Sequence, residues 1–243
     1  MIQLLSIVIP VRNEAENIRP TLTKLADAVH VPAEILIVYD EESDATLPVV
    51  RAMTPPPATE YRLVQNTIGR GPANALKAGF VAARGEALIV TMADLSDDWP
   101  AMPAMLAMFE RGYDLVSASR YMRGGEQVGG PWLKGKLSNA AGNSLHLLGL
   151  PTHDPTNSYK LYRSAKLRQL DLESDAGFEI NLEIVAKAWA RGWRIGEVPA
   201  RWEDRVAGRS KFKLMRWLPK YLRWYGYAVG VALSPRRRTE PRN

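Results

Sequence analysis

The acidic side chains best suited to chemistry follow directly after an apolar run. Residues 87–91 read Ala-Leu-Ile-Val-Thr, and Asp94, Asp97 and Asp98 come next. A carboxylate behind a buried segment is costly unless it faces water, a metal ion or a cation. Mg²⁺ and Mn²⁺ bind carboxylates together with substrate phosphates. Because Asp97 and Asp98 could instead cap a helix beginning at Trp99-Pro100, we expect Asp94 to organise a metal ion or a diphosphate.

Two further apolar runs end in side chains that accept hydrogen bonds. Residues 4–9 lead into Asn13 and Glu14, and residues 34–39 lead into Asp40. A carboxylate at the end of a strand can bind a nucleobase or a ribose. The alternative is that these residues cap the helices that follow, where Asn and Asp are favoured. Taken alone, each motif favours capping.

A loop with two glycines, residues 66–75, opens another helical pattern. Gly69 and Gly71 let the backbone approach a ligand, and the N-terminus of a helix favours anions. The loop lacks the spacing of a P-loop or of a dinucleotide-binding fingerprint. By itself it is a weak indication of a phosphate site.

Cations in the second half of the chain offer partners for phosphate. The planar fork of arginine suits phosphate oxygens, and the best choices are Arg120, Arg123, Arg205 and Lys211. Their spacing alone fits ordinary surface cations better.

Candidates for a general base are few. Glu179, Glu203 and Asp204 are the late acids that could serve a hydroxyl acceptor, but we expect Glu203 and Asp204 to pair with neighbouring arginines. His146 and His153 are isolated in the sequence, so we expect structural or loop roles for both.

The elements that must position these residues alternate in type along the first half of the chain. Runs rich in Val, Ile and Leu predict buried strands at residues 4–9, 34–39, 61–64, 87–91 and 115–118. Amphipathic stretches predict helices at residues 15–29, 45–53, 72–83 and 100–111. This alternation indicates an α/β fold with a Rossmann-like, doubly wound, mainly parallel sheet covered on both faces. Ligands bind such sheets at the carboxyl ends of the strands.

The pattern changes to glycine-rich loops after about residue 120. We expect further helices at residues 133–148 and 179–190, and further strands at residues 158–162 and 194–199. Between them, Asp154-Pro155-Thr156-Asn157-Ser158 is a turn by composition. These elements read as the second half of the same domain.

The composition narrows the class of protein. Of 243 residues, 46% are hydrophobic and 24% are charged, which is ordinary for a globular protein. The chain has no cysteine, which excludes disulfides and thiolate chemistry and fits a reducing compartment. Residues 1–10 read as a first strand rather than a signal peptide. No run reaches the roughly 18 to 20 apolar residues of a spanning helix.

The formal charge of +6 is concentrated at the C-terminal end. Residues 205–243 hold eleven Lys or Arg and one acid, a net +10 that leaves −4 for the rest of the chain. This distribution indicates an anionic surface as partner, although a solvated tail also fits. A nucleic acid is a poor candidate, because no nucleic-acid-binding motif is present.

Residues 212–233 combine aromatic and basic side chains: Trp217, Tyr221, Trp224, Tyr225 and Tyr227 among Lys213, Arg216, Lys220 and Arg223. Interfacial helices use this combination, so we expect an amphipathic membrane-surface segment. Packing of the aromatic rings on the domain is the alternative. Pro219 predicts a kink or a break into two short helices, and residues 234–243 are expected to form a disordered basic tail.

Together these motifs resemble the family 2 glycosyltransferases of the GT-A fold, and within them the dolichyl-phosphate (polyprenyl-phosphate) mannosyltransferase branch. The resemblance runs from Ser6 to about Leu214 and rests on the order and spacing of its motifs. The motifs are Ile9-Pro10-Val11-Arg12-Asn13-Glu14, Asp40-Glu41 with Asp44-Ala45-Thr46, Gly71 with Ala75 and Gly79-Phe80, Ala93-Asp94-Leu95, Ser119-Arg120-Tyr121, Asp154-Pro155, Glu197-Val198-Pro199, and Arg205 with Gly208-Arg209-Ser210-Lys211.

The resemblance implies a domain at residues 1–211, with a nucleotide-sugar half (1–119) and an acceptor half (120–211). The nucleotide-sugar pocket would be formed by Pro10, Val11, Asn13, Glu14, Asp40, Gly71, Ala93, Asp94 and Ser210. The catalytic residues would be Asp94, Arg120, Arg205 and Lys211, and the acceptor phosphate would meet Arg120, Arg123, Arg205 and Lys211. Asp94 and Ser96 would hold Mg²⁺ or Mn²⁺.

The sequence departs from the family pattern in two places. Met92 replaces the first acid of the Asp-x-Asp motif, and Ser96 replaces a Gln. Methionine does not bind a hard cation usefully, so we expect a weakened metal site or coordination shifted onto Asp94 with the diphosphate, water and Asp97. Tyr39 replaces an acid in the nucleotide loop, where stacking on a base and simple packing are both open.

The resemblance implies inverting transfer of a hexose, mannose or glucose, from a nucleotide diphosphate-sugar to polyprenyl or dolichyl phosphate. A phosphate oxygen is already anionic, so positioning and charge stabilisation suffice without a general base. The alternatives are transfer to a sugar hydroxyl in cell-envelope glycan synthesis and a catalytically impaired donor-binding homologue. We expect a cytoplasmic protein, peripherally bound to the membrane, with a membrane protein or a second copy as further candidate partners.

Overall fold

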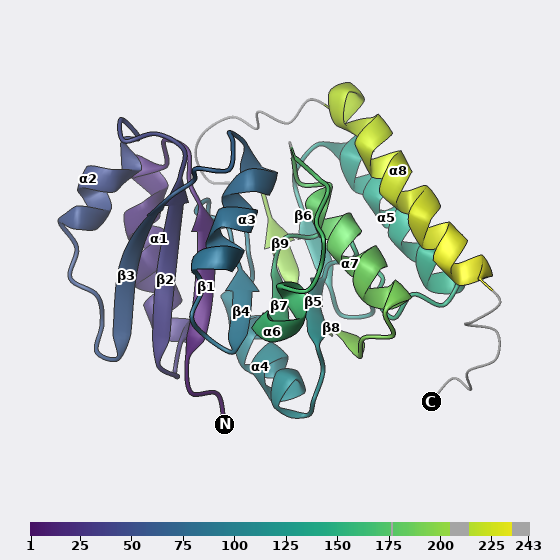
Figure 1. Ribbon diagram of the computed structural model, residues 1–243, viewed down its shortest axis with the longest axis horizontal. Coiled ribbons are helices and arrows are strands. Elements are labelled where there is room, and N and C mark those ends of the chain that lie inside the picture. The colour runs from purple at the N-terminus through teal and green to yellow at the C-terminus, as the bar shows by residue number, and fades with distance from the viewer. Residues whose placement is uncertain (176, 205–213, 235–243) are drawn as a thin grey trace.

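The chain folds around a seven-stranded sheet with the order β3-β2-β1-β4-β7-β5-β8 (Figure 1). This computed structural model describes residues 1–175, 177–204 and 214–234. The strands of the sheet are β1 (Leu5–Pro10), β2 (Ala33–Tyr39), β3 (Thr59–Gln65), β4 (Ala87–Val90), β5 (Leu115–Ser119), β7 (Lys160–Arg163) and β8 (Ile195–Pro199).

The sheet is mainly parallel, which confirms the expected α/β fold. β1 lies parallel to β2 and β4, β2 to β3, and β5 to β8. β7 is antiparallel to both β4 and β5, and it begins two residues later than the sequence pattern predicts. A small sheet of β6 (Glu126–Val128) and β9 (Arg201–Glu203) was not predicted, because these three-residue strands contain no apolar run.

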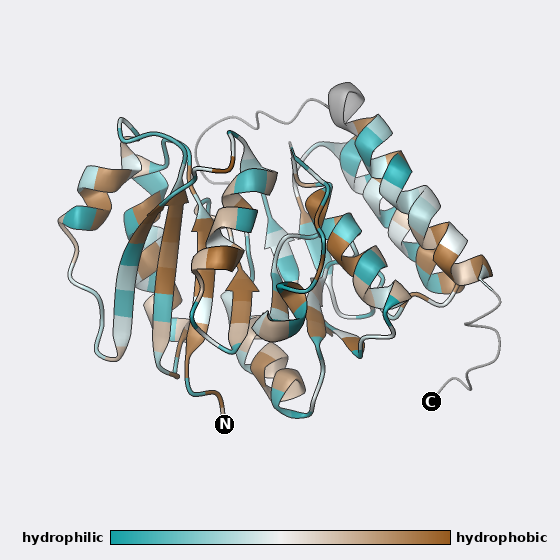
Figure 2. Cartoon of the chain, viewed as in Figure 1, coloured by the Kyte–Doolittle hydropathy of each residue, from teal (hydrophilic) through white to brown (hydrophobic). Residues whose placement is uncertain are grey.

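Helices cover both faces of the sheet. α1 (Ala15–Ala28), α2 (Thr46–Arg51) and α4 (Met102–Glu110) pack on one face, and α3 (Pro72–Ala82) and α7 (Ile180–Ala190) pack on the other. The shorter η1 (Trp99–Ala101) and α6 (Ser164–Leu167) precede α4 and follow β7. Figure 2 shows the apolar residues concentrated in the strands between these layers.

The two faces use alternate residues of each strand. In β1, Ile7 and Ile9 join the core under α1, while Val8 joins the core under α3. A Cβ added at Gly79 would lie 2.4 Å from Val8 Cγ1. The backbone of α3 therefore sits directly on the strand, which brings the loop before α3 to the carboxyl end of β1.

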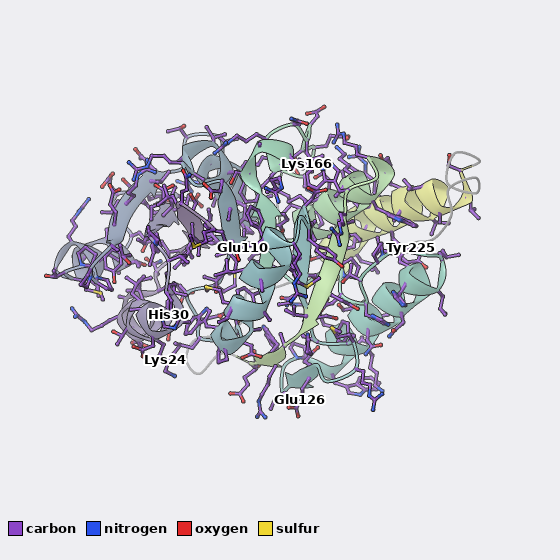
Figure 3. All side chains as sticks on the ribbon, turned by 90° about the horizontal axis from the view of Figure 1, so that it is seen from below. Lys24, His30, Glu110, Glu126, Lys166 and Tyr225 are labelled. Carbon is purple, nitrogen blue, oxygen red and sulfur yellow. The ribbon has the colours of Figure 1, made fainter. Side chains whose placement is uncertain are left out.

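Two outer helices, α5 (Trp132–Leu147) and α8 (Leu214–Leu233), lie side by side at one end of the molecule (Figure 1). Tyr225, labelled in Figure 3, joins them through a 2.9 Å hydrogen bond between its hydroxyl and Ser144 Oγ. The expected break at Pro219 is wrong: α8 continues through this residue. Beyond the proline, Trp224 and Ala228 are buried in the core cluster that contains α7, and this packing holds the helix together.

No helix in the described part of the chain combines the length and the apolar composition required to cross a bilayer.

Candidate functional site

Two cavities open where the parallel strands end. The smaller has a volume of about 210 Å³ and is lined by residues that follow β1 and β2 and by Arg70. The larger has a volume of about 580 Å³ and is lined by residues that follow β4 and β5, by the turn before β7, and by α5, α7 and α8. The site thus occupies the edge that a doubly wound sheet offers to ligands.

The smaller cavity brings together three loops predicted to bind a nucleotide. Asn13 and Asp40 both line it. Asp40 accepts hydrogen bonds from Asn66 Nδ2 at 2.7 Å and from Gly71 N at 3.2 Å, so the glycine loop is fixed to the end of β2. Asn13 has a φ of 57°, a left-handed conformation that asparagine tolerates, and its N–H donates to Asp44 at 3.0 Å.

The capping alternative fits one of the strand ends and fails at two others. In the motif Asp40-Glu41-Glu42-Ser43-Asp44, Asp44 accepts from Thr46 N at 2.8 Å at the start of α2. Glu14 stands at the N-terminal cap position of α1 but makes no capping bond, and it accepts from Asn17 Nδ2 at 2.7 Å instead. Asp98 stands before η1, likewise without a capping bond, and accepts from Arg201 N at 2.8 Å.

Other residues predicted to bind the nucleotide are buried and are not among the described residues that line the smaller cavity. Pro10 and Val11 are buried at the end of β1, and Ala93 is buried with its carbonyl accepting from Thr21 Oγ1 at 3.1 Å. Tyr39 packs in the core, and its hydroxyl donates to Glu42. That hydrogen bond raises the pKa of Tyr39. Of the two readings for Tyr39, this environment favours packing.

Two buried carboxylates form part of the lining of the larger cavity. Asp94, Ser96 and Asp97 all line it, and the two acids are 5% and 8% exposed. Asp94 Oδ1 accepts from Ser96 Oγ at 2.6 Å. Asp97 Oδ2 accepts from Thr91 Oγ1 at 2.8 Å and Met92 N at 3.0 Å. Burial and the neighbouring charge of Asp94 raise the pKa of Asp97 to about 7.

Arg120 is the cationic centre of this cavity. Its Nε donates to Asp154 Oδ2 at 2.6 Å and its Nη2 donates to Asp154 Oδ1 at 2.9 Å. Burial acts to lower the pKa of Arg120, but the charge of Asp154, its hydrogen bonds to Arg120 and the neighbouring Tyr121 and Asp97 together raise that pKa. Against its own burial, Asp154 has a lowered pKa because of Arg120. Arg120 is therefore held as an ion pair, a partnership that the sequence analysis missed.

Hydroxyl groups surround the guanidinium. Thr156 Oγ1 lies 3.3 Å from Arg120 Nη2 and 2.6 Å from Ser138 Oγ, and both residues line the cavity. Ser138 and Lys134 come from α5, where their four-residue spacing places them on one face of the helix. This four-residue spacing is visible in the sequence and could have identified Lys134 and Ser138 as neighbours on one face of a helix.

Another part of the lining of the larger cavity is apolar. It comes from α5, α7 and α8 and from Phe178, two residues before α7, and the side chains from these helices include Leu137, Ala140, Ala141, Leu182, Leu218 and Leu222. A single cavity is therefore lined both by charged residues that follow β4 and β5 and by apolar residues from helices.

The donor set at Asp94 fits a divalent cation that is shared with a ligand. The described residues contain no group of three or more His, Cys, Asp or Glu able to hold a metal ion. Mg²⁺ sites in proteins often use one or two carboxylates together with substrate phosphates, and Asp94 and Asp97 supply two carboxylates to one cavity. Met92 lines the same cavity and adds no hard ligand.

The structure does not place several of the predicted residues at either cavity. Arg123 is exposed, and it is not among the described residues that line either cavity. Arg205, Ser210 and Lys211 fall outside the described residues. Glu203 is exposed and paired with Arg201 at 2.7 Å, which confirms the expected ion pair.

The two histidines are not isolated from each other. The rings of His146 and His153 stack with centroids 3.6 Å apart, and His153 Nδ1 lies 2.5 Å from Glu197 Oε1. Residues 146 and 153 meet because the chain turns back after α5, which no spacing rule reveals. Glu179, the remaining candidate base, is buried and accepts from Gly177 N at 3.2 Å.

Comparison with known proteins gives relatives over most of the chain. The model of the family described as Glycosyl transferase family 2 matches residues 6–171. The chain is 33% identical to undecaprenyl-phosphate mannosyltransferase from Micrococcus luteus, over 84% of this chain and 85% of that protein. It is 26% identical to dolichol-phosphate mannosyltransferase from Pyrococcus furiosus, over 91% of this chain, and the match spans only 64% of the length of that protein.

The fold is shared with a solved structure. Glucosyl-3-phosphoglycerate synthase from Mycobacterium tuberculosis, in complex with Mn²⁺, UDP-glucose and phosphoglyceric acid, superposes with a TM-score of 0.68 at 16% identity. The match covers 96% of this chain and 81% of that one. This likeness establishes the GT-A arrangement of the sheet and its helices.

Proposed function

Because the chain belongs to glycosyl transferase family 2, we propose that it transfers a hexose from a nucleotide diphosphate-sugar to a polyprenyl phosphate, with inversion at the anomeric carbon. The observation that carries this proposal is the larger cavity, which is lined both by Arg120 and its hydroxyl neighbours and by apolar side chains of α5, α7 and α8. An amphiphilic acceptor needs both environments in one cavity. The names of the Micrococcus and Pyrococcus relatives point to the same class of acceptor.

The donor would occupy the smaller cavity and the acidic rim of the larger one. Asn13 and Asp40 offer hydrogen bonds to a nucleoside, and the diphosphate would extend towards Asp94. A divalent cation held by Asp94 and Asp97, with Ser96 hydrogen-bonded to Asp94, would neutralise the leaving diphosphate. Because Met92 contributes no hard ligand, we propose that this site is weaker than one with an additional acid.

The acceptor needs orientation more than activation. A phosphate monoester is anionic at neutral pH and attacks without losing a proton, so catalysis reduces to positioning and charge stabilisation. Among the described residues that line the larger cavity, the carboxylates are Asp94 and Asp97. Their proposed place at the diphosphate argues against a base for a sugar hydroxyl.

The acceptor lipid requires access to a membrane, and α5 and α8 supply a surface for it. Among the side chains described on these helices or directly after α5, eight large apolar ones are exposed: Trp132, Leu133, Leu137, Leu147, Leu148, Leu222, Tyr227 and Leu233. Neither helix contains an acidic residue. Basic residues near an anionic leaflet contribute about 1 kcal/mol each. We propose peripheral attachment to the cytoplasmic face of the membrane through this surface.

The test is transfer from labelled nucleotide hexoses in the presence of Mn²⁺ and detergent-solubilised polyprenyl phosphate. We expect label in the organic extract, and none after the Asp94→Ala substitution. Phosphoglyceric acid, which is bound in the structural neighbour, should remain unlabelled. Label confined to a water-soluble glycan, or donor binding without turnover, would contradict the proposal.

A further inference from the structure

The Arg120–Asp154 pair is held by a chain of hydrogen bonds that begins on a neighbouring strand. Glu197, in β8, accepts from Thr152 Oγ1 at 3.0 Å and from His153 N at 2.8 Å. Thr152 Oγ1 in turn accepts from Asp154 N at 3.1 Å. The Glu197 carboxylate therefore fixes the turn that presents Asp154 to Arg120.

The same turn is fixed from two other sides. Ser117 Oγ, in β5, donates to the Asp154 carbonyl at 3.0 Å. A Cβ added at Gly142 would lie 2.0 Å from the His153 carbonyl, so the backbone of α5 rests directly on the turn. Thr152 and Asp154 are fully buried. Because water has no access to these atoms, a lost hydrogen bond there has no replacement.

Glu197 does not belong to the cavity whose geometry it controls. It is not among the described residues that line the larger cavity, whereas Arg120 is. Asp154 occupies Nε and Nη2 of Arg120, so the direction of Nη1 is set by where Asp154 stands. A displacement of about 1 Å in a group that orients a reactant can cost about 100-fold in rate.

We propose that Glu197 is a positioning residue for the acceptor phosphate, acting through Thr152 and Asp154 on the Arg120 guanidinium. The phosphate-binding part of this inference rests on the proposed function. The mechanical part, the coupling of Glu197 to the orientation of Arg120, rests on the hydrogen bonds alone. The two parts have separate readouts.

The first readout is steady-state kinetics of Glu197→Gln and Thr152→Val. Glutamine keeps the shape of Glu197 but has one acceptor oxygen, and valine removes the hydroxyl that bridges Glu197 to Asp154. We expect KM for polyprenyl phosphate to rise roughly 10- to 100-fold with KM for the nucleotide sugar unchanged. The matched control is Glu126→Gln, an exposed acid at the edge of the molecule (Figure 3) that pairs with Arg201.

The second readout needs no activity. The Nε–Hε resonance of Arg120 in a ¹⁵N spectrum, identified by its loss in Arg120→Lys, reports the hydrogen bond to Asp154. We expect it to move in Glu197→Gln and in Thr152→Val and to stay in place in Glu126→Gln. An unmoved resonance in both variants, or equal rises in the two KM values, would overturn the proposal. If the wild type does not glycosylate polyprenyl phosphate while the resonance moves, the proposed function fails and the coupling stands.

Discussion

Arg120 and Asp154, which are 34 residues apart in the chain, form a two-point ion pair with N–O distances of 2.6 and 2.9 Å. Both side chains are almost completely removed from water. The two charges have opposite signs and compensate each other. Removal of either charge would leave the other buried without its partner.

Asp154→Asn should destabilise the protein strongly. The substitution leaves the Arg120 charge buried without its carboxylate, and breaking such a pair costs about 3–5 kcal/mol. Urea unfolding measures the loss, with Asp27→Asn, an exposed acid on α1, as the control. A loss below about 1 kcal/mol, the level of a surface pair, would contradict the buried pairing.

Asp97 should make stability depend on pH. Burial raises its pKa from 3.8 to about 7, so between these values the folded state keeps a proton that the unfolded state has released. The free energy of unfolding should therefore fall as pH rises from 4 to 7, by up to about 4 kcal/mol. The measurement is urea unfolding across this range with EDTA present. Asp97→Asn should remove this part of the slope, and parallel curves for the two proteins would show that Asp97 titrates normally.

Met92→Asp should strengthen metal binding. The side chain of residue 92 lines the cavity beside Asp94 and Asp97, and a third carboxylate adds a hard, charged ligand. We expect Mn²⁺ to bind roughly tenfold more tightly in the presence of a nucleoside diphosphate. Titration of free Mn²⁺ by electron paramagnetic resonance measures this affinity, and Met92→Leu is the control. Equal affinity in the two variants would place the cation elsewhere.

The α5–α8 surface should enter the headgroup region of an anionic bilayer. The chain has no cysteine, so Leu137→Cys and Leu222→Cys each provide one site for an environment-sensitive fluorophore. We expect a blue shift and quenching by spin-labelled lipid when vesicles containing anionic lipid are added. Val81→Cys, at an apolar residue on α3 that is more exposed than Leu137 and Leu222, should show neither change. A response of Val81 equal to that of Leu137 would mean that the protein does not bind in this orientation.

The sequence predicts the first half of the fold well, because its information there is local. The apolar runs at residues 4–9 and 87–91 correspond to β1 and β4, and each is long enough to identify a buried strand by itself. Asp40 follows the run at residues 34–39 in β2 and Asp94 follows β4, so their places after parallel strands put both on one edge of the sheet. The antiparallel direction of β7 depends on how the chain returns to the sheet. The residue types at 160–163 do not specify this direction.

Single residues of the candidate site can be predicted from the sequence. Contacts between residues that are distant in the chain cannot be predicted in the same way. Asp94 is recognisable from its type and its place after a strand, whereas Arg120 is singled out only by the family resemblance; both line the larger cavity. The pairing of Arg120 with Asp154 and the stack of His146 on His153 depend on how the chain returns after α5. Pro219 shows the reverse case, in which tertiary packing of α8 overrides a local preference.

The reversed direction of β7 has a consequence for how variants of the protein can be designed. The loops after β1 and β2 line the smaller cavity as they leave the sheet, whereas the turn at residues 154–158 reaches the same edge before an antiparallel strand. The smaller cavity and this turn therefore share no loop. Substitutions in the turn or in α5 change no residue that is described as lining the smaller cavity.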